Sequence, residues 1–511
     1  MKKILNLGIC LMMMVALLSG CGSEQASNGE KVFNYGTTAY GVDMHNTGLN
    51  PHDDYSGWSA VRYGVGETLF KFNKNMEIEP WLAKSYERLD DYTIKITLKD
   101  NITFSSGRAL DGQAVKECLE DLIATHDRAP NDLKIESITA DGQTITIKSK
   151  EKVPALLNYL SDPYAAIIDM NYGVTSDRNV AGTGPFIATS ISDTAISLKK
   201  NPNYWGGPVN MDEVNVKEII DGDTLTMAMQ SGELDAVQGL PYASLSLFNN
   251  DKYKISSTET SRVFFAQLNY ATPALQDKRV RQAIAMGIDK VGFTQNLLHG
   301  NGTPAVGAFP DNFTFGNKTV TAPQFNLEEA KQLLTQAGYS DSDGDGYVDK
   351  DGQKLTIRWL TYPGRQELPL LAESVQASLK QIGIDVKVNN TANVQDFLAK
   401  GDWDIYASAF VTAPTGDPEY FFTTHCLQTS AKNRGHYYNP ELEALAVQLH
   451  NEFDPAKRAE LATQMQQIIL DDDAFIFVSH LKMSFVMKNN VVGFEAHPSD
   501  YYEITANLNY E

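Results

Sequence analysis

The sequence is poor in cysteine and in long apolar runs. Four cysteines occur in 511 residues, and two of them, Cys10 and Cys21, lie within the first 21 positions. The other two, Cys118 and Cys426, are too few and too far apart to hold a chain of this length in a disulfide framework. No apolar run after the first twenty residues is long enough to span a bilayer. The sequence therefore excludes a disulfide scaffold and predicts no membrane-spanning helix in the mature chain.

Positive charge and catalytic motifs are also scarce. The chain has 43 Lys and Arg against 64 Asp and Glu, which gives a net charge of −21. This balance argues against nucleic-acid partners and against electrostatic binding to anionic lipid, and it is compatible with a cationic ligand. The sequence contains no Gly-x-Ser-x-Gly, His-Glu-x-x-His, Cys-x-x-Cys or P-loop motif. We therefore expect no enzyme; a lipid-anchored hydrolase would need an acid, base and nucleophile that the sequence does not bring together.

The N-terminus is the strongest local signal. Lys2 and Lys3 precede an apolar run from Ile4 to Leu18, and Leu-Ser-Gly then leads to Cys21. A short basic start, an apolar core and small residues are typical of a secretory signal. Leu-Ser-Gly-Cys resembles the bacterial lipoprotein box, which implies cleavage before Cys21 and a lipid on its sulfur. The alternative is an ordinary signal with an incidental cysteine. The small polar residues that follow are suited to a tether.

The rest of the chain predicts an α/β fold in two or more domains, because 511 residues exceed one hydrophobic core. Thr93 to Leu98 alternates as a half-buried strand does. Further on, a strand at Lys354 to Thr361, a helix at Leu368 to Ile382 and a strand at Ile384 to Val388 form a β-α-β pattern. Such a pattern predicts parallel strands joined by a right-handed crossover.

The stretch from Ala409 to Asn439 is the most plausible binding surface. A strand-like segment ending at Phe410 runs into Thr412–Pro418, which has two prolines and a glycine and continues neither strand nor helix. Five aromatics, two histidines and Cys426 follow before Asn439. Ligands collect where strands of α/β sheets end. The alternative is a surface loop with aromatic side chains packed beneath it.

One acidic segment resembles a calcium-binding loop. Asp341, Asp343, Asp345 and Asp349 match acidic positions of an EF-hand, but the twelfth position, which needs a bidentate acid, is Gly352. We therefore favour an acidic turn between a helix and a strand over a calcium site.

Several separated stretches resemble the family-5 extracellular solute-binding proteins of bacteria, and they occur in that family's order. These stretches are Pro80–Tyr86, Thr93–Gly107, Gly182–Phe186, Asn201–Trp205 and Asp277–Lys290. The resemblance implies the lipid-anchored component of an ABC importer, a monomer on the outer face of the cytoplasmic membrane that delivers its ligand to permease and ATPase subunits. It also implies that no cofactor is required.

The fold implied by this resemblance is a two-lobed α/β clamshell, the large peptide- and nickel-binding type of class II, with mixed sheets and a central cleft. Ligand would stabilise the closed form because only there does it contact both lobes. The expected parts are the signal peptide (1–20), the tether (21–30), lobe I (31–262, with an extra subdomain at about 70–178), lobe II (263–479) and a return to lobe I (480–511).

Fewer residues indicate whether the chain resembles the nickel-binding or the peptide-binding branch of this family. The stretch Phe410–Pro418 lacks the tryptophan- and aspartate-rich motif of peptide binders. The histidines that follow its Asp-Pro resemble those of the nickel-binding branch. This resemblance implies a ligand in which a small chelator, such as histidine or a metallophore, holds Ni(II). Short peptides are the alternative. The arginine that this branch can use for the chelator is missing at Ser161–Ala165, so Arg62 or Arg108 would replace it.

The resemblance and the chemistry of these side chains give the candidate site. His425 and His436 are the candidate metal ligands, although a loop histidine is more often a surface residue. The aromatic candidates have core packing as their alternative, and Cys426 is expected to be a buried thiol. The candidate ligand-contacting residues are Tyr40, Trp58, Arg62, Thr412, Thr415, Tyr501 and Tyr502.

Overall fold

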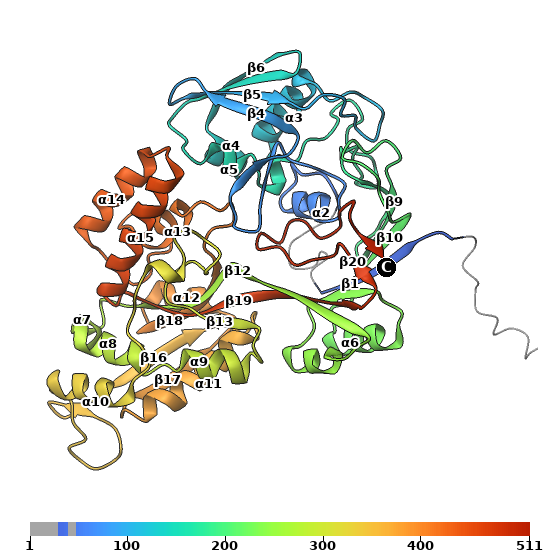
Figure 1. The fold of residues 1–511 in the computed structure, drawn as a ribbon. Helices are drawn as coiled ribbons and strands as arrows, with labels where there is room; N and C mark the ends of the chain where they lie inside the picture. The colour runs from blue at the N-terminus through green and yellow to red at the C-terminus, as the bar shows by residue number, and fades with distance from the viewer. Residues whose placement is uncertain (1–28, 39–47) are drawn as a thin grey trace, which may run out of the picture.

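The computed structural model describes residues 29–38 and 48–511 (Figure 1). The predicted lipid site Cys21 and the candidate contact Tyr40 lie outside the described residues. Within the described part of the chain, no helix has the length and apolar character needed to cross a membrane.

Two long strands connect the two halves of the molecule. β12 (Tyr253–Leu268) and β19 (Phe475–Lys488) pair antiparallel at the centre of an 11-stranded sheet. One side of the pair continues into the lower half of Figure 1 and the other into the upper half. The lower strands beyond β12 are β18 (Ile405–Val411), β16 (Thr356–Thr361) and β17 (Asp385–Asn390). The upper strands beyond β19 are β11 (Ala236–Gln238), β1 (Val32–Thr37), β10 (Glu213–Glu218), β9 (Ala195–Lys200) and β8 (Phe186–Ile191). β13 (Gly302–Pro304) also pairs with β19.

A smaller sheet forms the top of the upper half. The predicted strand Thr93–Leu98 is β5, and its apolar residues alternate into the core as expected. Asp111 caps α3 by accepting a hydrogen bond from Ala114 N, and this helix packs on the sheet. The elements here are β2 (Phe70–Phe72), β3 (Ile78–Pro80), β4 (Ala83–Arg88), β6 (Ile135–Asp141), β7 (Thr144–Ser149), α2 (Ser56–Arg62), α3 (Gly112–Thr125), α4 (Ala129–Leu133) and α5 (Leu156–Tyr159).

The lower half confirms the predicted β-α-β pattern. β16 pairs parallel with β17, and α11 connects them. Side chains cap its helices: Asn326 accepts from Glu329 N at the start of α10, and Asn439 and Asp454 precede α14 and α15, each with proline at the first turn. The helices of this part are α7 (Pro273–Gln276), α8 (Lys278–Met286), α9 (Lys290–Gly292), α10 (Leu327–Gln336), α11 (Glu367–Lys380) and α12 (Val394–Lys400), with α13 (Glu419–His425), α14 (Pro440–Asn451) and α15 (Pro455–Asp471) at the left of Figure 1, above the strand pair. α6 (Gly222–Ser231) packs on β11 and is drawn at the lower right.

The segment that follows the loop Thr412–Pro418 contains a helix, which corrects the sequence-based expectation of a loop. Glu419–His425 forms α13, because Asp417 Oδ1 accepts a hydrogen bond from Glu419 N and starts the helix after Pro418. The helix buries Phe421 and Phe422, as the alternative reading of this stretch proposed.

The loop Thr412–Pro418 joins the two halves. Tyr501 OH donates to Pro414 O at 3.0 Å, and Asn158 Nδ2 donates to Thr415 O at 2.8 Å. Gly416 has φ +72°, and a Cβ there would lie 2.5 Å from Met76 O. The loop therefore packs directly against residues of the upper half, and only glycine fits at position 416.

The strand pair is irregular where it passes between the halves. The register of β12 against β19 shifts between Glu259 and Val263, which marks a bulge. Val263 pairs with His480. The expected end of the first part of lobe I, after residue 262, therefore lies beside the expected end of lobe II, after residue 479.

Candidate functional site

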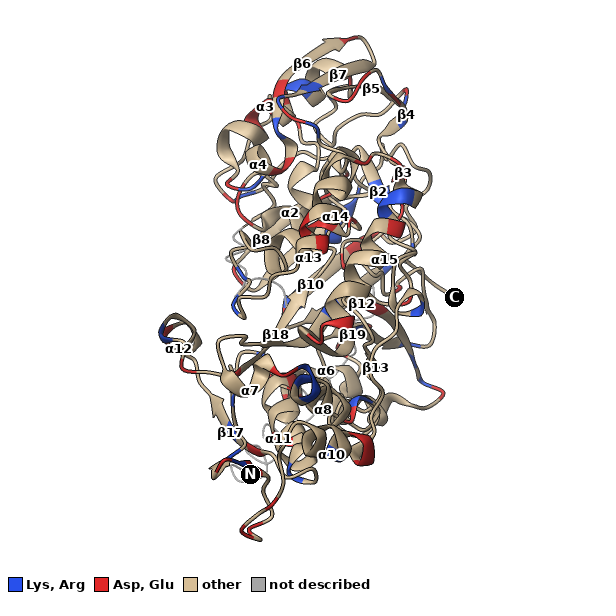
Figure 2. Ribbon diagram, turned by 90° about the vertical axis from the view of Figure 1, so that its left-hand side faces the viewer, with Lys and Arg blue, Asp and Glu red and all other residues tan. Residues whose placement is uncertain are grey.

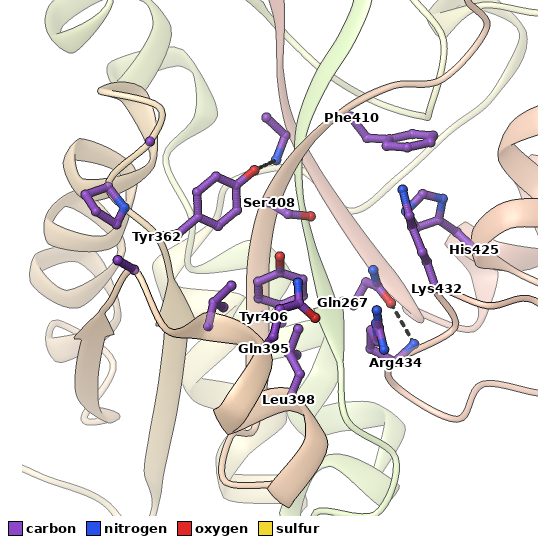
Figure 3. A pocket seen from close by; sticks show the side chains of 15 residues that line it. Gln267, Tyr362, Gln395, Leu398, Tyr406, Ser408, Phe410, His425, Lys432 and Arg434 are labelled. Carbon is purple, nitrogen blue, oxygen red and sulfur yellow. Dashed lines mark hydrogen bonds between the residues drawn. The ribbon is translucent and has the colours of Figure 1, made fainter. Parts of the chain in front are cut away.

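A cavity of about 540 Å³ opens on the lower half of the molecule, above the sheet (Figure 3). Its floor comes from β12 and β18, and its walls come from α12, the chain after β16 and the chain after α13. α12 projects from the body of the lower half, which is clearest in Figure 2. The lining residues are Gln267, Tyr362, Pro363, Gly364, Ala392, Val394, Gln395, Leu398, Tyr406, Ser408, Ala409, Phe410, His425, Lys432 and Arg434.

The alternation of β18 explains which side chains reach the floor. Tyr406, Ser408 and Phe410 share one face of the strand, whereas Ile405 and Ala407 pack into the core on the other face. Gln267 of β12 pairs with Tyr406 and adds its amide to the same floor.

His425, the last residue of α13, forms part of the wall. Its ring stacks on Phe421 at 5.4 Å and meets Phe410 edge-on at 4.3 Å. Burial, and then the charges of Lys432 and Arg434, lower the pKa of His425 to about 3. The imidazole is therefore neutral at physiological pH, and a metal would not have to compete with a proton for it.

Two cations line the same wall. Lys432 Nζ lies 4.6 Å from the centroid of the Phe410 ring, and Arg434 N donates to Gln267 Oε1 at 3.1 Å. Neither side chain forms an ion pair with another described residue. Figure 3 shows Phe410, His425 and Lys432 grouped on one side of the cavity and Tyr362 on the other.

A second group of cations lies at the strand bulge. Arg262 is half-buried at the end of the β12–β18 pairing, and its side chain forms no hydrogen bond or ion pair within residues 29–38 and 48–511. Burial, and then the charge of Arg365, lower its pKa to about 10, while Asp500, Glu367 and Tyr362 raise it. Nothing in the sequence around Arg262 distinguishes it from an arginine whose charge is paired, so the sequence does not indicate it as a site residue.

The arginines expected to hold a chelator are already paired. Arg62 donates to Asp500 Oδ2 at 2.7 Å and lies 3.3 Å from Glu503 Oε1. Arg108 pairs with Glu117 and Asp169 at 2.8 and 2.9 Å. Unlike these two guanidinium groups, that of Arg262 forms no ion pair with described residues.

The predicted threonines and tyrosines are also engaged. Thr412 is fully buried and its hydroxyl donates to Ser261 O and Ala308 O. Thr415 is buried within the loop, and its carbonyl accepts from Asn158 Nδ2. Tyr501 OH donates to Pro414 O, and Tyr502 OH accepts from Phe72 N. Of these hydroxyls, that of Tyr501 joins the two halves.

The structure separates the other predicted site residues from the cavity. Trp58 is half-buried and lies 6.1 Å from Tyr501 in the aromatic seam. His436 is exposed with φ +58° and does not line the cavity. Of the predicted metal ligands and ligand contacts that the structure describes, only His425 lines the cavity.

The acidic segment Asp341–Asp349 forms an exposed turn, as predicted. Oxygen atoms of Asp341, Asp343 and Asp345 lie within 4.8 Å of one another, and all three residues are exposed. Asp341 accepts from Gly344 N and Gly346 N, and Lys354 pairs with Asp345. Backbone amides hydrogen-bond Asp341 and one lysine pairs with Asp345, and these contacts stabilise the turn.

Comparison with known sequences identifies relatives along the whole chain. The family described as bacterial extracellular solute-binding proteins, family 5 (middle) matches residues 77–433. The nickel-binding protein NikA of Staphylococcus aureus is 28% identical over 493 residues, covering 96% of each chain. The oligopeptide-binding protein AppA of Bacillus subtilis is 25% identical over 540 residues, covering 97% of this chain and 96% of its own. These relatives are solute-binding proteins and not enzymes.

Solved structures agree with this assignment. A nickel ABC transporter protein from Bacillus halodurans is 30% identical, with a TM-score of 0.83 over 94% of this chain and 100% of its own. NikA from Staphylococcus aureus, solved in complex with Ni(L-His)2, is 27% identical, with a TM-score of 0.72 over 94% and 100%. The two-lobed α/β fold expected from the sequence is confirmed by these similarities.

Proposed function

Because the chain belongs to the bacterial extracellular solute-binding proteins of family 5, we propose that it captures a nickel chelate for an ABC importer. The chelate, nickel with histidine or a metallophore, occupies the cleft between the lobes and passes to the membrane permease, which works with an ATPase. The observation that carries this proposal is His425, a neutral imidazole on the wall of a cavity. Imidazole suits nickel as a borderline nitrogen donor.

A chelator needs partners of its own, and the unpaired cations provide them. Arg262 lies beside Arg365 at the strand bulge and forms no ion pair with described residues. Guanidinium groups bind carboxylates in a planar, two-point geometry. We therefore propose Arg262, instead of Arg62 or Arg108, as the arginine that receives the chelator.

The same proposal includes the anchor and the lobes. Processing before Cys21 would leave a lipidated chain on the outer face of the cytoplasmic membrane, held by the tether 21–30. Lobe I (31–262 and 480–511, with its subdomain at about 70–178) and lobe II (263–479) would close about the bulge in β12. Ligand would favour the closed form because it contacts both lobes only there.

Calorimetry on the soluble chain from Ser23 onward tests the function. Nickel with histidine, nickel alone and a pool of short peptides are titrated separately. We expect heat from nickel with histidine only. Binding of peptides without metal would assign the chain to the peptide branch, for which the similarity to AppA is the supporting observation.

His425→Phe should weaken chelate binding by about tenfold or more, since one metal–imidazole bond is lost while the phenyl ring keeps the stacking on Phe421 and Phe410. Its melting temperature should stay close to that of the unchanged chain. Titration calorimetry and thermal unfolding measure the two effects.

His436→Ala is the matched control, because that histidine is exposed and outside the cavity. We expect it to bind the chelate normally. Normal binding by His425→Phe would remove the imidazole from the site, and weakened binding by His436→Ala would restore the second predicted ligand.

A further inference from the structure

The return segment, residues 499–504, connects the upper half of the molecule to the lower half. Tyr501 OH donates to Pro414 O of the lower half, and the Tyr501 side chain is buried. Ile504 N donates to Arg62 O at 2.9 Å, which fixes the segment on α2. The contact between the halves at Tyr501 therefore depends on how firmly the return segment is held on α2.

Two carboxyl groups of the return segment share one guanidinium group. Arg62 donates to Asp500 Oδ2 at 2.7 Å and to Asp500 O at 3.1 Å, and its Nε lies 3.3 Å from Glu503 Oε1. The side chains of Arg62 and Glu503 are 7% and 4% exposed, whereas that of Asp500 is 37% exposed. Asp500 also has φ +65°, a left-handed conformation that surrounding contacts must support. One buried cation balances one carboxylate, so the second carboxyl group is stable here only with a proton.

The other groups around this pair do not remove the imbalance. The charge of Arg262, on β12, acts on Asp500, but the two residues form no ion pair. Tyr35 of β1 and Tyr63 beyond α2 also act on the cluster, and both are neutral phenols. Burial raises the pKa of Glu503 from 4.5 to about 8, although Arg62 opposes this. Glu503 and Asp500 are also hydrogen-bond partners of each other, which requires a proton between them.

We propose that Asp500 and Glu503 share one proton that keeps the return segment on Arg62, and that loss of this proton releases the segment and weakens the Tyr501–Pro414 contact between the halves. With the proton, the pair carries one negative charge, which Arg62 balances. Without it, two carboxylates face one guanidinium group, and their repulsion is relieved when Asp500 turns into solvent. The halves are therefore held together more firmly in acid than in alkali. This device concerns the halves and not the ligand, so it goes beyond the proposed function.

The direction of the pH effect follows from the number of protons that each form holds. In the released form the carboxyl groups meet water and have ordinary pKa values of about 4. In the fastened form the pair keeps its proton up to about pH 8. Between these two values the fastened form holds one proton more, so the ratio of fastened to released molecules falls by up to about tenfold for each pH unit. Outside this window the ratio no longer changes with pH.

Spin labels on the two halves measure this ratio without any ligand. The chain from Ser23 onward contains every described residue, and it receives Ser137→Cys on β6 and Thr335→Cys on α10, both at exposed positions. Cys118 and Cys426 are buried, so the label attaches to the introduced cysteines. Double electron–electron resonance is recorded from about pH 5 to about pH 9. We expect the population at the distance seen in this structure to decrease between about pH 5 and about pH 8, and a different distance to replace it.

Glu503→Gln removes the shared proton and keeps the size of the side chain. Its ratio of fastened to released molecules should change by less than about threefold over the range in which the unchanged chain changes by about tenfold or more. Asp500→Asn leaves one carboxylate for Arg62 and should behave in the same way. Glu495→Gln is the matched control, because Glu495 precedes the same segment, is 60% exposed and pairs with the exposed Lys74. It should keep the full pH dependence. Thermal unfolding verifies that each variant is folded.

Three results would overturn the shared proton. They are a distance distribution of the unchanged chain that does not vary with pH, a contact that strengthens as pH rises, and an equal pH dependence in whichever of Glu503→Gln and Asp500→Asn is folded. Because no ligand is present, none of these results depends on whether the chain binds a nickel chelate or a peptide. Failure of the proposed function in calorimetry would likewise leave the pH dependence of the halves unchanged.

Discussion

Arg458→Met is expected to lower the melting temperature by about 3 °C or more. Arg458 and Asp417 form an ion pair whose side chains are 6% and 8% exposed, with Nη2 to Oδ2 at 2.7 Å. Removing the guanidinium leaves a buried carboxylate without a counter-charge, which costs about 3 kcal/mol or more of the free energy of unfolding. Arg458 also donates to Leu449 O and Glu452 O at the end of α14, so these carbonyls lose their donors.

The control for this prediction is Lys331→Met, which removes an exposed ion pair with Glu328. Surface pairs of this kind contribute about 0.2–1 kcal/mol, so the melting temperature should move by only about 1 °C or less. A second variant, Arg458→Met with Asp417→Asn, tests the cause. Because the buried charge is then absent, the double variant should recover part of the lost stability. No recovery would show that the packing of Arg458, and not the charge of Asp417, sets the effect.

The local rules of the sequence predict much of this fold. Proline after Asn439 and Asp454 predicts where α14 and α15 begin, and the amide of Glu329 meets Asn326 as a capping residue should. Each of these features depends on neighbours within a few positions. The strand–helix–strand pattern at 354–388 is equally local, and its parallel pairing follows from the crossover rule.

The site depends on partners that are distant in sequence, and there the predictions are less complete. Arg62 meets Asp500, which is 438 positions away, so nothing near Arg62 indicates that its charge is engaged. Arg262 is the reverse case, a strand residue whose lack of an ion pair with described residues becomes visible only in three dimensions. Lys432 and Arg434 look like an ordinary basic turn until the fold places them against Phe410 and Gln267.

His425 shows what type of signal the sequence does contain. Its position after an Asp-Pro and a run of aromatics marks it as a ligand candidate, and the structure places it on the cavity wall. His436 follows the same pattern and lies outside the cavity, because the chain lines the cavity only as far as Arg434, and Gly435 O then accepts from Tyr270 N beyond the end of β12. Spacing along a sequence does not distinguish these two histidines; their positions in the fold do.

Glu67→Gln is expected to become more stable than the unchanged chain as pH rises from about 4.5 to about 8. Glu67 is fully buried and accepts hydrogen bonds from Thr183 Oγ1, Tyr204 OH and Trp205 Nε1 at 2.7–2.8 Å. Burial raises its pKa from 4.5 to about 7, although the three hydrogen bonds and Lys99 oppose this. Between these values the folded chain keeps a proton that the unfolded chain has released, so folding loses up to about 3 kcal/mol as pH rises through this window.

Glutamine fits the same site without ionising. Its carbonyl can accept from Thr183 and Trp205, and its amide can donate to the oxygen of Tyr204, whose hydroxyl then turns away. The difference in melting temperature between Glu67→Gln and the unchanged chain should therefore grow by several degrees between pH 4.5 and pH 8. Other titrating groups are common to both chains and cancel in this difference. Glu136→Gln, on an exposed strand position, should give a constant difference. If Glu67→Gln instead loses stability relative to the unchanged chain as pH rises, the three donors outweigh burial and the carboxylate is folded in its charged form.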